Sequence, residues 1–374
     1  MLWIKSMCDR GSGRILSGSA AAGGLPSREA GIRMSRFLHR GDLMLIVILI
    51  FAAVGALLAL GAAQKRWRRL RNISGGLLVS YFTVLLLLGA GEIYFRYFYA
   101  ESENVYTLAT KNWLDRYWDT NSYGFRDREW TPDDLAGKQT VVVLGDSFAA
   151  GWGIQNPADR FSDVLAAKLG DDYAVINLGR YGTSTPEQLA ILRDESPVKK
   201  PDVVILQYFL NDINYAGLTL DLLPTPEASP AWAQESYLAN FIYWRFLRAA
   251  DADEEFYARW WQWSYDAYDN VGIWSVHKEE IKAFVEYVDG IGARLIVVIF
   301  PNLLDVVRSV PYVDRVEQAF QEFGENEVLK LFDAAAAWDQ NDLMVSRRDS
   351  HASISFNHYV GEQLYERFFA PPGG

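Results

Sequence analysis

The fold is decided by an apolar run that breaks at a glycine and then presents an aspartate and a serine: Val141-Val142-Val143-Leu144-Gly145-Asp146-Ser147-Phe148-Ala149. Four β-favouring residues before a glycine predict a buried strand that ends in a turn. In an α/β layout the serine then lies at the carboxyl end of a strand, where open parallel sheets bind their ligands. Ser147 is therefore a candidate nucleophile, if the rest of the chain supplies a base and hydrogen-bond donors for an oxyanion.

Strand and helix patterns alternate along the chain after this run. Further strands are predicted at 174–177, 203–206 and 295–300, and helices at 161–169, 186–192, 279–289 and 313–323. Strands separated by helical segments indicate a three-layer α/β domain with a mainly parallel sheet, which we place at residues 138–370. A final helix is expected shortly after His351.

Composition excludes several classes of protein. The 374 residues include one cysteine, Cys8, so neither an internal disulfide nor a cysteine-based zinc site can form. The four histidines form no HExxH or similar ligand pattern, and the chain has no GxxxxGK[ST] or GxGxxG motif. A metal site is therefore not expected, and nucleotide binding has no motif to support it.

Charge is segregated between the two ends of the chain. Residues 1–72 carry twelve Lys and Arg against three Asp and Glu, while the remainder carries 24 against 44 and has a net charge of −20. Residues 73–374 therefore carry too much negative charge to be a good partner for nucleic acid.

Two apolar runs predict a membrane anchor at residues 43–99. The first, 43–63, is 21 residues without a charge, and about 20 are needed to cross a hydrocarbon core. The second span is placed at 73–95, and near its end Glu92 can pair with Arg96, one helical turn further on. Two buried helices of a soluble core are the less favoured alternative. Residues 1–42 are interpreted as a disordered basic leader, or as an extension upstream of a start at Met34.

The loop between the two runs holds five cations in the seven residues 65–71. By the positive-inside rule this loop is cytoplasmic, which places everything after residue 100 outside. The cations Arg33, Arg36 and Arg40 before the first run favour the opposite orientation.

Two segments interrupt or precede the α/β pattern. Residues 100–137 form an aromatic connecting segment that leads into the first strand. Residues 231–275 hold six tryptophans, and we expect a helical insertion or cap beside the site. Its rings could stack on sugars or meet lipid, but core packing is the favoured interpretation.

Three donors for an oxyanion are expected at successive strand ends. They are the backbone N–H groups of Ser147 and Gly182 and the side-chain amide of Asn211. Donors fixed in advance stabilise the negative oxygen of a tetrahedral intermediate. Taken singly, Gly182 could be only a turn residue and Asn211 only a cap.

The base is expected to be His351, with Asp349 two residues away to orient it. His39 lies in the leader and His277 next to the Trp-rich insertion, far from any predicted strand end, so both are expected to be structural or surface residues. His358 is expected to pack under the loop. Asp146 precedes the nucleophile and is expected to order the turn rather than to carry protons.

These residues resemble the SGNH hydrolases, also called the GDSL esterase/lipase family. The resemblance covers about residues 121–370 in four ordered blocks: Gly145 to Phe148, Asn177 to Gly182, Asn211-Asp212 and Asp349 to His351. The segment 121–127, Asn-Ser-Tyr-Gly-Phe-Arg-Asp, also looks like membrane-anchored bacterial members. The resemblance implies a flavodoxin-like sandwich and a cofactor-independent serine esterase, acyl hydrolase or acyltransferase.

Two departures from the family pattern concern the third and fourth blocks. Phe209 stands where the family usually has glycine, and its ring could narrow the acyl pocket. The last block is usually Asp-x-x-His, whereas here Arg348 stands three residues before His351 and Asp349 only two. Either Asp349 orients the histidine with altered geometry, or another acid such as Asp342 serves. An α/β-hydrolase G-x-S-x-G elbow would need glycine at Ala149.

The sequence thus predicts a two-span, membrane-anchored esterase facing the periplasm or cell exterior and acting on acyl esters, including acetyl esters, of envelope glycans or lipids. One alternative uses the same site to pass the acyl group to a sugar hydroxyl. Another is a catalytically silent module that binds glycan or scaffolds an envelope complex, an interpretation favoured by the altered last block.

Overall fold

The computed structural model describes residues 49–214, 216, 229–248 and 252–371. The predicted leader, with Cys8 and His39, and the first part of the span 43–63 lie outside these residues. The chain divides into two compact units. The unit that holds the predicted anchor, called the anchor unit below, comprises residues 1–99, 106–109 and 228–248. The unit that holds the predicted site, called the catalytic unit, comprises 100–105, 110–227 and 249–374.

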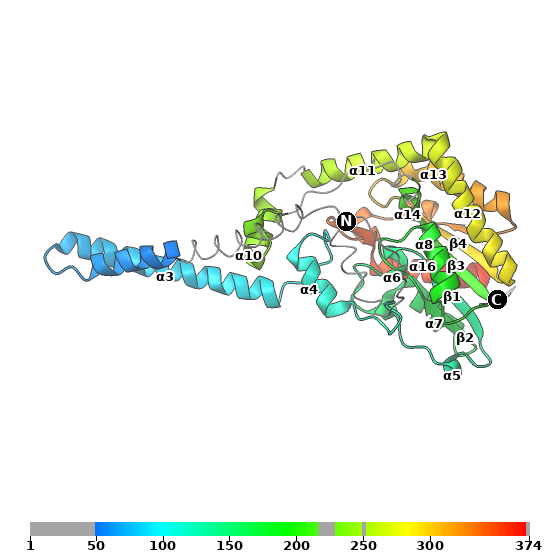
Figure 1. Ribbon diagram of the computed structural model, residues 1–374, viewed down its shortest axis with the longest axis horizontal. Helices are drawn as coiled ribbons and strands as arrows, with labels where there is room; N and C mark the ends of the chain where they lie inside the picture. Colours follow the sequence, from blue (N-terminus) through cyan, green and yellow to red (C-terminus); the bar gives the residue numbers. More distant parts are fainter. Residues whose placement is uncertain (1–48, 215, 217–228, 249–251, 372–374) are drawn as a thin grey trace, which may run out of the picture. The chain divides into compact units, whose positions relative to one another are not determined.

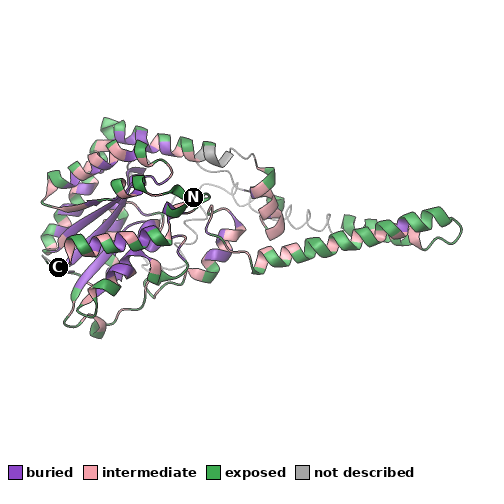
Figure 2. Cartoon of the chain, turned by 180° about the vertical axis from the view of Figure 1, so that it is seen from behind, coloured by how far each residue is buried: buried purple, intermediate pink, exposed green. Residues whose placement is uncertain are grey.

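The anchor unit is built on α3, Arg68–Tyr97, which is the long helix at the blue end of Figure 1. Most of its side chains are exposed, which Figure 2 shows in green. Among the described helices only α3 is long and apolar enough to cross a membrane; the helix Leu49–Ala62 is apolar but shorter. The two helices touch where the Tyr81 hydroxyl donates to the carbonyl of Phe51 over 2.7 Å.

The anchor unit also contains part of the Trp-rich segment: η4 (Ala231–Ala233), α10 (Tyr237–Ile242) and the π-turn η5 (Tyr243–Leu247). Glu92 of α3 accepts hydrogen bonds from Ser236 Oγ at 2.8 Å and from the N–H of Leu238 at 2.9 Å, at the start of α10. Glu92 and Arg96 form the expected ion pair at 2.6 Å. One carboxylate thus ties α3 to α10.

The catalytic unit contains a five-stranded parallel sheet in the order β2-β1-β3-β4-β5. The strands are β1 (Gln139–Leu144), β2 (Tyr173–Asn177), β3 (Val203–Phe209), β4 (Arg294–Phe300) and β5 (Glu327–Lys330). The order is flavodoxin-like, and its direction reverses between β1 and β3. The carboxyl ends of these strands therefore form the edge at which sheets of this kind bind their ligands.

Helices cover the sheet on both faces, as the α/β pattern predicts (Figure 1). The helix α7 (Phe161–Leu169) packs on α16 (Ile354–Phe368), while α12 (Val271–Ile291) packs on α8 (Thr185–Ala190) and α13 (Val306–Phe323). The strands between these helices are almost wholly buried (Figure 2). The remaining short helices are α4 (Leu108–Tyr117), α5 (Pro132–Leu135), α14 (Phe332–Ala337) and α15 (Gln340–Leu343).

The second half of the Trp-rich segment belongs to the catalytic unit as α11, Ala252–Asp269. Trp261 is buried, and its ring meets that of Phe209 edge to face at 5.4 Å between centroids. Tyr265 and Tyr268 are also buried. The described part of the segment is thus mostly helical, and these three rings pack in the core.

The sequence patterns missed β5 and a small antiparallel hairpin, β6 (Met344–Ser346) with β7 (Asp349–Ala352). These strands have three or four residues, too few for an alternation to stand out. The hairpin is important because β7 carries both Asp349 and His351 and leads directly into α16.

The crossing of α16 over α7 depends on Gly361. A Cβ at this position would lie 2.7 Å from the carbonyl oxygen of Phe161 and 2.8 Å from the Cβ of Val164. Because the first of these atoms is backbone, a side chain would force the two helices apart. This packing fixes the helix that follows the hairpin of β6 and β7.

We expect Gly361→Ala to lower the free energy of unfolding by about 1–3 kcal/mol, because it overpacks the crossing. The matched control is Gly290→Ala in α12, where a Cβ meets no atom within 4 Å. That change should be neutral or stabilise by up to about 1 kcal/mol. Thermal unfolding of the two full-length variants checks the difference, and equal midpoints would contradict the close packing.

Candidate active site

The nucleophile turn joins β1 to the short helix α6, Ser147–Ala150. Asp146 caps this helix, with its Oδ1 accepting from the N–H of Phe148 at 2.9 Å, so it orders the turn as expected. Gly145 has φ +152°, and a Cβ there would lie 2.8 Å from the Cβ of Ala149. The turn therefore requires glycine and places Ser147 at the first position of α6, at the carboxyl end of β1.

Gln207 supports the same turn from β3, and sequence analysis missed it. Its Oε1 accepts from the N–H of Asp146 at 3.1 Å and from the N–H of Ala149 at 3.2 Å. The side chain is fully buried. A polar residue in the otherwise apolar run of β3 was the available signal, since a buried amide needs hydrogen-bond partners.

The imidazole and the carboxylate come from alternate positions of β7. Side chains two apart in a strand point to the same side, so Asp349 and His351 face the same way. His351 Nδ1 lies 2.5 Å from Asp349 Oδ1, and the N–H of His351 donates to the same oxygen at 3.2 Å. The extended backbone lets an Asp-x-His spacing bring the two side chains together.

The other imidazole nitrogen reaches the serine. His351 Nε2 lies 2.8 Å from Ser147 Oγ, which joins residues 204 positions apart. Asp349 is buried, while the side chains of Ser147 and His351 are partly exposed. A hydroxyl, an imidazole and a buried carboxylate in this order can deprotonate the hydroxyl for attack and stabilise the resulting imidazolium.

The three expected oxyanion donors all lie at the carboxyl edge of the sheet. Ser147 follows β1, Gly182 follows β2 and Asn211 follows β3. Within the described chain, no protein acceptor is found for the N–H of Ser147 or Gly182. Gly182 is exposed with φ +74°, a conformation that favours glycine. These two N–H groups are available to a substrate oxygen.

Burial raises the pKa of Asp146, which lies under the turn, and the N–H of Phe148 and the charge of His351 oppose that effect. The Phe148 ring packs at a tilt against the His351 ring, with 4.9 Å between centroids, and against the Phe209 ring, with 4.4 Å between centroids. Phe209 is buried against Phe148, next to the nucleophile, where the family usually has glycine.

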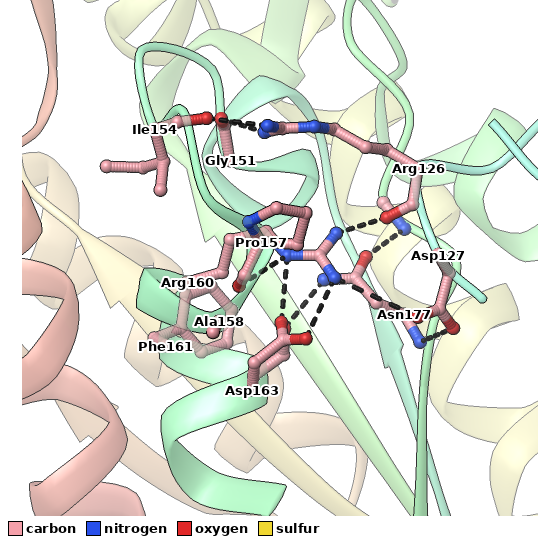
Figure 3. Close-up of polar contacts among 12 residues, drawn as sticks. Arg126, Asp127, Gly151, Ile154, Pro157, Ala158, Arg160, Phe161, Asp163 and Asn177 are labelled. Atoms are coloured by element: carbon pink, nitrogen blue, oxygen red, sulfur yellow. Dashed lines mark hydrogen bonds and ion pairs between the residues drawn. The ribbon is translucent and has the colours of Figure 1, made fainter. Parts of the chain in front are cut away.

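The loop after α6 is held by Arg126, from the segment 121–127. Its guanidinium donates to the carbonyls of Gly151 at 2.7 Å and Ile154 at 2.6 Å (Figure 3). The ring of Trp118 lies against the guanidinium at 4.9 Å. Burial, followed by the charge of Arg160, lowers the pKa of Arg126 to about 10.

A second buried arginine joins this segment to α7 and β2. Arg160 is 1% exposed and forms a two-point contact with Asp163, at 2.8 and 3.1 Å (Figure 3). Asp127 lies 3.8 Å from Arg160 and accepts from the N–H of Asn177 at 3.0 Å. Burial raises the pKa of Asp127 despite these partners. The motif therefore braces the loops around the serine.

The other candidate residues lie elsewhere. His277 is fully buried between Tyr208 and Glu280, at 2.7 Å from each, so it is structural as expected. His358 does not pack under the loop: it is exposed on α16 and pairs with Asp159 at 2.9 Å. Asp342, the alternative acid, is exposed on α15, and His351 pairs with Asp349 instead. In the described ranges no group of three or more His, Cys, Asp or Glu could hold a metal ion.

A serine, a histidine and a buried aspartate in contact at the edge of a flavodoxin-like sheet are the arrangement that α/β hydrolytic enzymes use. The chain belongs to the GDSL-like lipase/acylhydrolase family, whose sequence model matches residues 143–358. It is accordingly an ester-hydrolysing enzyme.

Solved structures with a similar chain trace have low sequence identity. TesA is 16% identical, with 61% of this chain and 97% of that chain covered and a TM-score of 0.39. A lipase/acylhydrolase from Enterococcus faecalis is 14% identical, with 61% and 96% covered and a TM-score of 0.37. The psychrotrophic esterase EstA from Pseudoalteromonas sp. is 15% identical, with 61% and 96% covered and a TM-score of 0.37. A comparison with curated proteins gives no significant match.

Asp212, next to Asn211, is a buried carboxyl that the chemistry does not use. Its Oδ2 accepts from Thr185 Oγ1 at 3.0 Å, whereas its Oδ1 has no hydrogen-bond partner in the described part of the chain. Burial and the nearby charge of Asp146 raise the pKa of Asp212 well above its usual value. The folded state therefore holds this proton more tightly than the unfolded chain does.

The Asp212 carboxyl favours folding at low pH and opposes it as the pH rises through its folded-state pKa. We expect Asp212→Asn, which has no proton to lose, to raise the unfolding midpoint relative to wild type by an amount that grows between about pH 5 and pH 8. Exposed Asp171→Asn is the control. Thermal unfolding at several pH values measures both, and a gap that does not change with pH would show that Asp212 is not held protonated.

Proposed function

We propose that the protein is a membrane-anchored serine esterase that cleaves acyl esters through an acyl-serine intermediate. In this proposal Ser147 is the nucleophile, His351 the general base and Asp349 the orienting acid. The observation that carries the proposal is the continuous relay from Asp349 through His351, 2.5 Å on one side of the imidazole and 2.8 Å on the other. The family supports ester hydrolysis independently.

The first half of the reaction forms the acyl-enzyme. His351 Nε2 takes the proton of Ser147 as Oγ bonds to the ester carbonyl carbon, and the carbonyl π electrons move to oxygen. The N–H groups of Ser147 and Gly182 and the amide of Asn211 would stabilise that oxyanion. When the intermediate collapses, the bond to the alcohol oxygen breaks and Nε2 returns its proton to the departing alkoxide.

The second half uses water in place of the serine. His351 takes a proton from water as the water oxygen bonds to the acyl carbon. Collapse then breaks the bond to Ser147 Oγ, which regains its proton from Nε2, and releases the carboxylic acid. Asp349 stabilises the imidazolium in both halves and does not itself take the proton.

We expect Ser147→Ala and His351→Gln each to lower kcat on a short-chain aryl ester by about 10³-fold or more, because the members of such a relay act as a unit. His358→Gln is the matched control, since His358 is exposed and pairs with Asp159 instead of joining the relay. Hydrolysis rates and labelling of Ser147 by a fluorophosphonate probe check the assignment. Full activity of Ser147→Ala would refute it.

The silent-module alternative predicts that the wild-type chain is not labelled by the same probe. The relay geometry opposes that alternative, since the altered last block still brings Asp349 to His351. A second alternative, transfer of the acyl group to a sugar hydroxyl, uses the same acyl-serine. Following an isotopically marked acyl group with and without a glycan acceptor separates hydrolysis from transfer, because only a transferase delivers the label to the glycan.

The anchoring part of the proposal is supported by α3. Its 30 residues extend about 45 Å at 1.5 Å per residue, enough for a hydrocarbon core of about 30 Å. Exposed Tyr94 and Tyr97 near its end suit the aromatic belt of a membrane interface. With the helix Leu49–Ala62 as a first span, the cationic segment 65–71, which joins the two helices and includes the first turn of α3, would be cytoplasmic. The catalytic unit would then be extracytoplasmic, facing envelope glycans or lipids.

We expect a reporter that is active only outside the cytoplasm to be active when fused after Gly374. The physical reason is the cationic loop between the two apolar helices, which is retained on the cytoplasmic side. A reporter active only in the cytoplasm, fused at the same position, is the control. Activity of that second fusion alone would place the catalytic unit inside and remove envelope substrates from the proposal.

A further inference from the structure

The second oxygen of the catalytic carboxylate has its own hydrogen-bond donor. Ser102 Oγ donates to Asp349 Oδ2 at 2.5 Å, while Asp349 Oδ1 faces the imidazole of His351. Ser102 is 5% exposed and Asp349 3% exposed. Both oxygens of a buried charge are thereby engaged, each by a different residue.

Ser102 is fixed by the threonine that begins the next part of the catalytic unit. The hydroxyl of Thr110 accepts from the N–H of Glu103 at 2.9 Å and donates to the carbonyl of Glu101 at 3.2 Å. The residues on either side of Ser102 are therefore bound to one buried side chain. This arrangement holds the serine hydroxyl in place.

The space around Asp349 Oδ2 is small. Gly153 approaches so closely that a Cβ there would lie 2.9 Å from this oxygen and 2.5 Å from a methyl carbon of Val345. In so confined a place water is a poor substitute for Ser102, since a bridging water needs room and several polar partners. Loss of the serine hydroxyl would leave a buried carboxylate oxygen without its donor, which is costly.

We propose that Ser102 is a positioning residue of the ester-hydrolysing site, holding Asp349 in the rotamer that orients His351. The catalytic machinery then begins well before residue 143, where the family match starts, and includes the segment 100–105 that follows α3 in the chain. The inference rests on the proposed roles of Asp349 and His351.

Ser102 can position Asp349 because the carboxyl group of an aspartate rotates easily about χ2. The χ2 angle of aspartate has a broad preference, so a carboxylate held through one oxygen can swing. With Ser102 on Oδ2 and His351 on Oδ1, the plane of the carboxylate is fixed, and the imidazole is fixed with it. A hydrogen bond to a charged group is a strong one, so its removal is expected to cost about tenfold or more in rate.

The test compares Ser102→Ala with Ser102→Thr in the full-length chain in detergent micelles. We expect Ser102→Ala to lower kcat on a short-chain aryl ester about tenfold with little change in KM, because Ser102 is buried and acts through Asp349. Ser102→Thr keeps the hydroxyl and should recover most of the activity. Ser309→Ala is the matched control: Ser309 is also a buried serine, but its hydroxyl donates within α13, to the carbonyl of Val306.

A spectroscopic readout separates this inference from the proposed reaction. Proton NMR of the resting protein should show a strongly deshielded His351 Nδ1–H resonance, assigned by its loss in His351→Gln. We expect this resonance to shift or broaden in Ser102→Ala and to be unchanged in Ser309→Ala. It depends on the contact between His351 and Asp349 and not on turnover.

The outcomes are distinct. An unchanged kcat and an unchanged resonance in folded Ser102→Ala would overturn the positioning role. If Ser102→Ala does not fold, Ser102→Cys, close in size but a weak donor, must show the same loss for the inference to stand. If wild type shows no hydrolysis but the resonance responds to Ser102, the proposed function fails while the positioning contact survives.

Discussion

The hydrogen bond between His351 Nε2 and Ser147 Oγ is the contact that the rest of the catalytic unit is arranged to make. It joins the end of the first strand to a hairpin near the end of the chain. A bond of this kind contributes only about 1 kcal/mol by itself, so it cannot impose its own geometry. The geometry comes from elements already fixed on each side: the turn held by Gly145 and Gln207, and the hairpin that leads into α16.

The buried charges around the serine show how those elements are held. Arg126 satisfies backbone carbonyls of the loop after α6, and Arg160 connects the same segment to Asp163 of α7. Buried charge is costly unless it is paired and hydrogen-bonded, and here each guanidinium has several acceptors. Rigid loops around a reacting serine reduce the reorganisation that is needed when the oxyanion forms. Such preorganisation accounts for much of the rate enhancement of sites of this kind.

The sequence predicted the sheet and the serine because both depend on local pattern. The apolar run 141–144 and the glycine after it form β1 and the nucleophile turn as expected, and α7 spans the predicted 161–169. Ser102 and Gln207 could not be found in the same way, since their importance lies in contacts 247 and about 60 positions away. No local spacing encodes such a contact. The anchor was predicted from length and apolarity alone, which is why its first span, partly outside the described residues, stays a prediction.

The spacing of the last block shows how backbone conformation can replace a sequence motif. In the family pattern the acid precedes the base by three residues, and here it precedes by two. A three-residue spacing suits a turning backbone, whereas in an extended strand only even spacings place two side chains on one face. Because β7 is extended and paired with β6, Asp349 at two positions is the spacing that reaches Nδ1 of His351. The two-residue spacing of Asp349 and His351 is therefore the one that an extended strand requires. The altered last block is compatible with a working relay.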